Sequence, residues 1–218
     1  MRGEWIWQIG VMDFRRTFRS AAIAYAGLVA TLPPDHLDVP ALGEWTLREL
    51  LGHTVSSALR QVPDVLGTRS PQVDVETAEG YFAFAREAPA ELLAAATAAS
   101  ADDARAGGKL LGDRPSDHVS ALIGRATEAL SRVNDDDVVT TPVGGMRVRD
   151  WIPTRTFELV VHGLDTAAAL DLPLDLPLET IAESLTLASR TTLAIGAGIP
   201  LLRALTGRSP LPPNFSMI

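Results

Sequence analysis

The predicted helix over residues 150–170 constrains the fold more than any other feature, because it is apolar on nearly all of its sides. At about 100° per residue, apolar side chains fall on both flanks and on the back of this helix. These side chains are Ile152, Phe157, Leu159, Val160, Val161 and Leu164. A helix that is apolar all round is a buried helix. We therefore expect residues 150–170 to be enclosed by other elements of the fold.

The composition favours helices as the enclosing elements. Hydrophobic residues make up 46% and charged residues 21% of the 218 residues, which is ordinary for a soluble globular protein. Alanine and leucine are abundant while aromatic residues are only 6%, a balance that favours helices over strands. The length fits one domain, and we expect an all-α fold with four main helices before residue 170.

Hydrophobic periodicity and helix-breaking residues place the helices along the chain. The clearest start is Thr46-Leu47-Arg48-Glu49, where a threonine N-cap and a glutamate three residues later form a capping box. Gly107-Gly108 is expected to interrupt the helical pattern, and Pro153 is expected in a first turn, where a missing N–H is tolerated. Residues 138–149 are predicted to form a small hairpin or an extended loop. The predicted helices span residues 14–32, 47–66, 78–106 with a kink or break at Pro89, 116–134, 150–170, and 178–205 with a break near 196–200.

Charge and cysteine content exclude several classes of function. The 19 Lys and Arg residues against 27 Asp and Glu residues give a net charge of −8, so no basic surplus exists to neutralise the phosphates of a nucleic acid. The chain has no cysteine, which excludes disulfides, thiolate zinc sites and a cysteine nucleophile. Any metal must therefore be held by histidine, aspartate or glutamate.

The N-terminal region bears on localisation. Arg15-Arg16 precede a short apolar run that ends at Pro33-Pro34, an arrangement that also occurs in export signals. Apolar residues recur here at helical spacing, so we interpret the run as an amphipathic first helix and expect a cytoplasmic protein. The run is too short for a membrane span, which takes about 20 residues. Met12 is a candidate start, because the residues before it carry no pattern.

A stripe of polar residues runs along the otherwise apolar helix at 150–170. Arg155, Glu158, His162 and Asp165 share this stripe, and buried charges are costly unless they are paired or bind a metal. One interpretation is a metal site, because Glu158 and His162 are spaced i, i+4 and can reach one ion from one helical face. The other is an internal polar cluster in which Glu158 pairs with Arg155 and His162 is hydrogen-bonded. The spacing alone leaves both open.

The remaining histidines and two serines give weaker signals. His53 is the natural third ligand, but on helical pattern alone a half-exposed surface histidine is favoured, because it shares its side with polar residues. His36, in a proline-rich loop, and His118, in a first helical turn, are interpreted as surface residues. Ser56-Ser57 near His53 would offer a hydroxyl nucleophile, yet serine inside a helix usually reflects close packing.

Three short segments match a known pattern. The run Trp45–His53 reads WTLRELLGH, and the run Thr154–Asp165 reads TRTFELVVHGLD, with the spacing Arg-x-x-Glu-x-x-x-His-x-x-Asp. The third is Leu205–Pro212, which reads LTGRSPLP. Together they resemble the DinB-like superfamily, and more closely its actinobacterial branch named for mycothiol-dependent maleylpyruvate isomerase. The resemblance covers residues 12–218, with specific motifs only in these three places.

The resemblance implies a fold and a site. The fold is a DinB-like four-helix bundle over about residues 12–170 with a C-terminal helical extension over about 171–218, in a single domain. The site is a divalent metal, usually zinc, held by His53, Glu158 and His162. Arg155 and Asp165 also match the pattern. Arg155 is therefore a candidate catalytic residue that contacts an anionic group or supports a metal ligand, and Asp165 is expected to orient a ligand.

The resemblance also implies a small-molecule thiol, mycothiol, as cosubstrate and a small electrophile as substrate. In the isomerase the thiolate would add to the cis double bond of maleylpyruvate, and the thiol would leave after rotation to give fumarylpyruvate. In the related S-transferases the thiol stays attached. The characterised isomerase carries a separate C-terminal domain, and the residues after 170 are too few for one of typical size. A metal-stabilised binding or regulatory module and a metal-dependent hydrolase are the alternatives.

Overall fold

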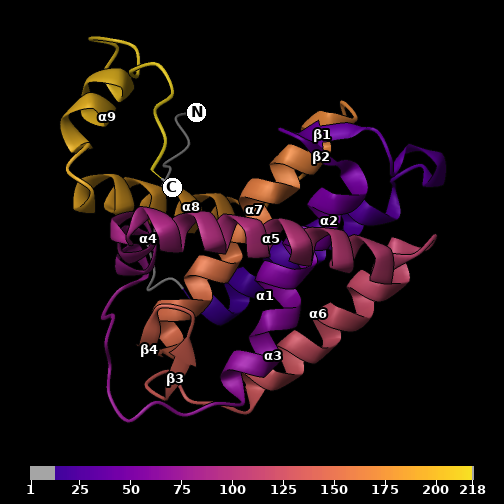
Figure 1. The fold of residues 1–218 in the computed structure, drawn as a ribbon, viewed down its shortest axis with the longest axis horizontal. Coiled ribbons are helices and arrows are strands. Elements are labelled where there is room, and N and C mark those ends of the chain that lie inside the picture. The colour runs from indigo at the N-terminus through magenta and orange to yellow at the C-terminus, as the bar shows by residue number, and fades with distance from the viewer. Residues whose placement is uncertain (1–12, 218) are drawn as a thin grey trace, which may run out of the picture.

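The computed structural model describes residues 13–217 and is built almost wholly from helices (Figure 1). The all-α fold predicted from composition and periodicity is confirmed. The candidate start at Met12 lies outside the described residues. The α-helices are α1 (Phe14–Ala30), α2 (Leu47–Val55), α3 (Gln61–Leu66), α4 (Ala78–Glu87), α5 (Ala90–Leu111), α6 (Pro115–Ser131), α7 (Val148–Ala169), α8 (Leu178–Ala194) and α9 (Gly198–Leu205).

A four-helix bundle forms the centre of the fold. Helix α1 packs against α6 and α7, while α2 packs against α7 and α3 packs against α6. The four members of the bundle are therefore α1, α6, α7 and the continuous pair α2 and α3. Their apolar faces meet in one core, and full burial of each large side chain stabilises the fold by about 1.5–3 kcal/mol. Fully buried members of this core are Phe18, Tyr25, Leu47, Leu51, Val62, Val119, Trp151 and Ile152.

Helix α7 is enclosed as its apolar pattern predicted. Helices α1 and α2 cover it from the bundle, and α4 and α8 cover it from outside. Phe157 of α7 joins Phe82 of α4 and Leu187 of α8 in a second apolar cluster on that outer side. These helices surround most of α7, so its polar stripe must be accommodated inside the protein. Leu164, near the C-terminal end of α7, differs from the expectation because it is 49% exposed.

Helices α2 and α3 form one continuous rod that begins at the predicted capping box. The Thr46 backbone N–H donates to Glu49 Oε2 at 2.9 Å, and the Glu49 N–H donates to Thr46 Oγ1 at 3.3 Å. Between the two helices lies a π-helical turn, Ser56–Arg60. Such a turn inserts an extra residue into the helix and is frequent at functional sites.

Helix α5 crosses α2 at a contact made of backbone atoms. A Cβ atom added at Gly52 would lie 2.1 Å from the Ala104 carbonyl oxygen, and one added at Gly107 would lie 2.7 Å from the Gly52 carbonyl oxygen. The expectation that Gly107-Gly108 interrupts a helix is therefore wrong, because α5 continues through both residues. The glycines remove the side chains that would hold the two helices apart.

The start of α7 and the segment before Thr46 also differ from what the sequence predicted. Helix α7 begins at Val148, directly after the β-hairpin, so Pro153 lies in its second turn rather than its first. The proline-rich loop of His36 contains a 3₁₀ turn (Pro34–His36), and a short strand pair follows it, β1 (Pro40–Leu42) and β2 (Trp45–Thr46). Gly43, with φ +57°, provides the tight turn between these strands.

Three other predicted features are confirmed. Residues 138–149 form a hairpin of β3 (Val138–Thr141) and β4 (Gly144–Arg147), paired antiparallel with Val139 opposite Met146. The helical pattern from residue 78 breaks at Ala88-Pro89, between α4 and α5. The last helical stretch breaks between α8 and α9, and the yellow C-terminal segment lies beside them in Figure 1.

Candidate metal centre

Two members of the polar stripe of α7, Glu158 and His162, face α2 one helical turn apart. His162 Nε2 lies 3.3 Å from Glu158 Oε2, and each side chain is only 14% exposed. The stripe is directed at α2 because the other sides of α7 pack against α1, α4 and α8. The close pair therefore follows from the enclosure of α7 and the i, i+4 spacing.

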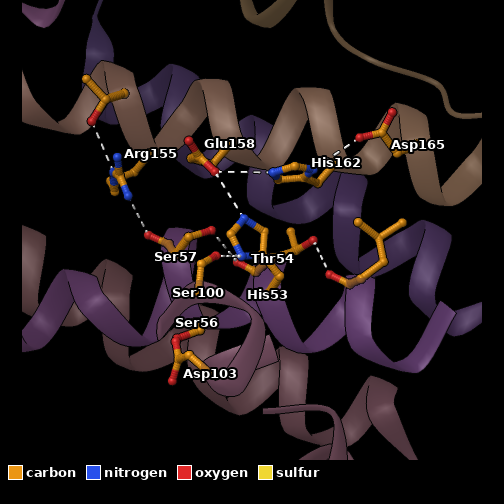
Figure 2. Close-up of polar contacts among 12 residues, drawn as sticks. His53, Thr54, Ser56, Ser57, Ser100, Asp103, Arg155, Glu158, His162 and Asp165 are labelled. Carbon is orange, nitrogen blue, oxygen red and sulfur yellow. Dashed lines mark hydrogen bonds and ion pairs between the residues drawn. The ribbon is translucent and has the colours of Figure 1, made fainter. Parts of the chain in front are cut away.

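His53 completes the cluster from α2 (Figure 2). Its Nε2 atom lies 3.8 Å from Glu158 Oε2, and its ring meets the ring of His162 edge to face at a centroid distance of 4.8 Å. The ring of Trp45 lies 4.8 Å from the His53 ring. One ligand atom from each of His53, Glu158 and His162 lies within 4.8 Å of the other two. The three residues that the resemblance implied as ligands are thus brought together.

Each histidine is also held at its second ring nitrogen. His162 Nδ1 lies 3.1 Å from Asp165 Oδ2, and His53 Nδ1 lies 3.2 Å from Ser100 Oγ of α5 (Figure 2). A partner at Nδ1 fixes the orientation of the imidazole and directs Nε2 toward a metal. Asp165 stands where the sequence placed it, whereas Ser100 was missed, because nothing distinguishes one serine in an alanine-rich helix.

The electrostatics of the cluster favour an ionised carboxylate beside a protonated imidazole. Burial acts to raise the pKa of Glu158, but hydrogen bonds with His162 and His53 and the nearby charge of Arg155 hold it well below its ordinary value. Burial acts to lower the pKa of His162, but its hydrogen bonds to Asp165 and Glu158 raise it to about 9. A proton therefore holds the pair together when no metal is bound.

The three donors fit a divalent metal. Two imidazole nitrogens and one carboxylate oxygen are the donor set of several catalytic zinc sites, in which a fourth position is open. At the usual bond lengths, tetrahedral ligands stand about 3.3–3.4 Å apart. The Nε2–Oε2 separations of 3.3 Å and 3.8 Å lie close to that value. Within the described residues, this is the group of three acidic or histidine side chains that meets the requirement.

Arg155 lies on the same stripe but points away from the three donors (Figure 2). It is 2% exposed, and its Nη1 atom donates to the Ser57 carbonyl at 2.8 Å and to Gln61 Oε1 at 3.0 Å. Its guanidinium also lies over the rings of Tyr81 and Trp151, 5.0 Å and 5.6 Å from their centroids. Arg155 thus ties α7 to the π-helical turn that follows His53.

The two serines considered as nucleophiles have other contacts. Ser56 donates to Asp103 of α5, and Arg60 donates both to Asp103 and, at 2.6 Å, to Ser56 Oγ. Ser57 Oγ donates to the Thr54 carbonyl at 3.5 Å. The hydroxyl that contacts His53 is that of Ser100, whose Oγ atom lies 3.2 Å from His53 Nδ1. In the described part of the chain, neither serine therefore forms the serine–histidine pair that a hydroxyl nucleophile needs.

The other two histidines lie at the surface, as the sequence indicated. His36 is exposed in the turn before β1, with Nδ1 3.1 Å from Asp35. His118 is exposed in the first turn of α6. Neither belongs to the cluster, so both serve as matched controls for substitution of its histidines.

Fold and site together define a class, a helical bundle with a two-histidine, one-carboxylate candidate metal centre at its heart. Residues 18–167 match the family described as Mycothiol maleylpyruvate isomerase N-terminal domain. Because the match covers well over half of the chain, the protein belongs to this family. Comparisons with curated proteins and with solved structures find no match. In the described part of the chain, no helix is both long and apolar enough to cross a membrane.

Proposed function

We propose that the protein is a metal-dependent enzyme that uses mycothiol, as an isomerase or an S-transferase acting on a small electrophile. The observation that carries the proposal is the convergence of His53, Glu158 and His162 in a chain of the mycothiol isomerase family. A bound divalent metal, zinc in this proposal, would lower the pKa of a thiol and make the thiolate available as nucleophile.

The residues of the chain would bind the metal and orient its ligands, while the cosubstrate supplies the nucleophile. The chain has no cysteine, so the sulfur nucleophile must arrive with the cosubstrate. His53, Glu158 and His162 would hold the metal, while Asp165 and Ser100 keep the two imidazoles oriented. The ring of Trp45 lies beside the ring of His53, with their centroids 4.8 Å apart. Three protein ligands leave a position for the thiol.

The test measures thiol-dependent turnover by zinc-loaded protein. Mycothiol would be supplied with maleylpyruvate, to detect isomerisation, and separately with chlorodinitrobenzene, to detect S-conjugation. We expect one of the two reactions to require both zinc and thiol, and to fall by at least about 100-fold in His162→Ala. His118→Ala, a surface histidine on α6, is the control that should keep full activity.

Other outcomes would replace the proposal with an alternative. Hydrolysis of an ester substrate that needs zinc but no thiol would identify a hydrolase. Zinc-dependent thermal stability without turnover, and without any effect of mycothiol on stability, would identify a metal-stabilised binding or regulatory module.

A further inference from the structure

A pocket separate from the metal centre lies between the start of α1, the first turns of α7, and α8. Its volume is about 550 Å³, which is within the range of small-molecule sites. Phe14, Ala78, Pro153 and Leu187 give it apolar walls. None of the residues of the metal centre lines it, so its chemistry is independent of the proposed function.

Glu183 of α8 is a buried acid that lines this pocket. The residue is 5% exposed, and its Oε1 atom has no hydrogen-bond partner among the described residues. The hydroxyls of Thr17 and Thr156 lie near the carboxyl group and also donate to backbone carbonyls, that of Asp13 at 2.9 Å and that of Ile152 at 3.5 Å. Burial raises the pKa of Glu183 to about 7. Hydrogen bonds with Thr17 and Thr156 act in the opposite direction, and the charge of Asp13 adds to the rise. A buried carboxylate oxygen that accepts no hydrogen bond, as Oε1 is here, is costly unless a ligand supplies a donor.

The other charged groups around the pocket already have partners, with one exception at its mouth. Asp13 accepts from two backbone N–H groups at the start of α1. The partnered side chains form the ion pairs Asp135–Arg15, Asp136–Arg149 and Asp150–Arg147. Arg190 has no ion-pair partner among the described residues, but its side chain is exposed. Glu183 Oε1 and Asp150 Oδ2 are therefore the two carboxylate oxygens of this pocket that are buried and accept no hydrogen bond among the described residues.

We propose that this pocket binds a small organic amine, whose protonated nitrogen pairs with the Glu183 carboxylate while its apolar body packs against Phe14, Pro153 and Leu187. A charge-assisted hydrogen bond from an ammonium group would satisfy the orphaned oxygen. The apolar walls would exclude water from this pair, which strengthens it.

The test compares three probes that share one alkyl chain and differ in charge. Hexylamine, hexanol and hexanoate would be titrated into zinc-loaded protein at pH 8 by calorimetry. We expect hexylamine to bind and the other two not to bind. Glu183→Gln keeps the shape of the side chain and removes its charge, and it should weaken hexylamine binding by at least about tenfold. Its fold would be checked by circular dichroism and its melting temperature.

Two further variants separate this site from its neighbours. His162→Ala disrupts the metal centre and should bind hexylamine as the wild type does, which excludes binding of the amine at the metal. Arg190→Gln should leave hexylamine binding unchanged or improve it. Equal hexylamine affinity in the wild type and Glu183→Gln would overturn the proposal. So would binding of hexanoate that Arg190→Gln abolishes, or no hexylamine binding at all.

Discussion

His162 Nε2 and Glu158 Oε2 stand 3.3 Å apart, while Nδ1 of the same imidazole lies 3.1 Å from Asp165. The imidazole is thus held between two carboxylates of its own helix, spaced four residues before it and three residues after it. His53 meets the same Glu158 oxygen from α2 at the longer distance of 3.8 Å, and its Nδ1 partner is a hydroxyl, that of Ser100, rather than a carboxylate. The two histidines are therefore held with different strength, and their partners should contribute unequally to metal affinity.

Metal content should depend on His53. We expect about one zinc per chain in the wild-type protein and a large loss in His53→Ala, because a two-ligand site binds zinc weakly. Mass spectrometry of untagged protein measures the content, with His36→Ala as the matched control. Wild-type protein that stays metal-free after zinc is added back would disprove the metal centre.

The groups that orient the histidines should control metal affinity. Asp165→Ala should weaken zinc binding by about 10–100-fold, because loss of such a partner frees the imidazole. Ser100→Ala should have a smaller effect, since a hydroxyl is a weaker partner than a carboxylate. Competition with a chromogenic chelator gives the affinities, and Asp102→Ala, an exposed acid on α5, serves as control. If all three variants bound zinc equally, these contacts would have no role in orientation.

The stability of the metal-free protein should fall in alkaline solution. The pKa of His162 is 6.5 in its reference state and about 9 in the folded chain, so the folded state binds the proton more tightly. This stabilisation is fully present below pH 6.5 and is lost as the pH rises through 9. The difference between the two pKa values corresponds to a free energy on the order of 3 kcal/mol.

Urea unfolding of metal-free wild type and His162→Gln would measure this effect, because the difference between the two cancels the other titrating groups. The difference should shrink between about pH 6 and about pH 10, and zinc-loaded wild type should not show the alkaline loss. A difference that does not vary with pH would mean that His162 is not protonated in the metal-free site.

The crossing of α2 and α5 should tolerate no added methyl group. Gly52→Ala would place a Cβ atom 2.1 Å from the Ala104 carbonyl oxygen, so the helices must separate, at a cost of about 3 kcal/mol or more. Zinc affinity should fall as well, because α5 carries Ser100. Gly124→Ala on α6 is the matched control, since nothing lies within 4 Å of its added Cβ. That variant should stabilise the protein by about 0.4–1 kcal/mol. Equal melting temperatures for the two variants would contradict the close crossing.

The features that the sequence predicted well depend only on residues close together within one segment of the chain. The apolar circumference of residues 150–170 predicted an enclosed helix, and its polar stripe placed Glu158, His162 and Asp165 on one face. The capping box at Thr46 fixed the start of α2 because both partners lie within four residues. None of these inferences required knowledge of what packs against the segment.

The features that the sequence did not reveal depend on a partner distant in the chain. His53 lies on a polar side of α2, which indicates a surface position when α2 is considered alone. In the structure α5 covers that side and brings Ser100 to His53. Gly107-Gly108 indicated a helix break when the segment was considered alone. The close packing of these glycines against Gly52 is seen only in the folded chain. The π-helical turn was also missed, and one of its carbonyls, that of Ser57, accepts from Arg155, which lies far along the chain.

The origin of the three donors from two helices has a consequence for folding. His53 and Glu158 are about a hundred residues apart, so a metal that joins them closes a loop of nearly half the chain. Such an ion acts as a removable cross-link, which would lower the entropy of any partly unfolded state that retains it. Its affinity would then report on the assembly of the bundle as a whole, since neither helix alone presents more than two of the donors.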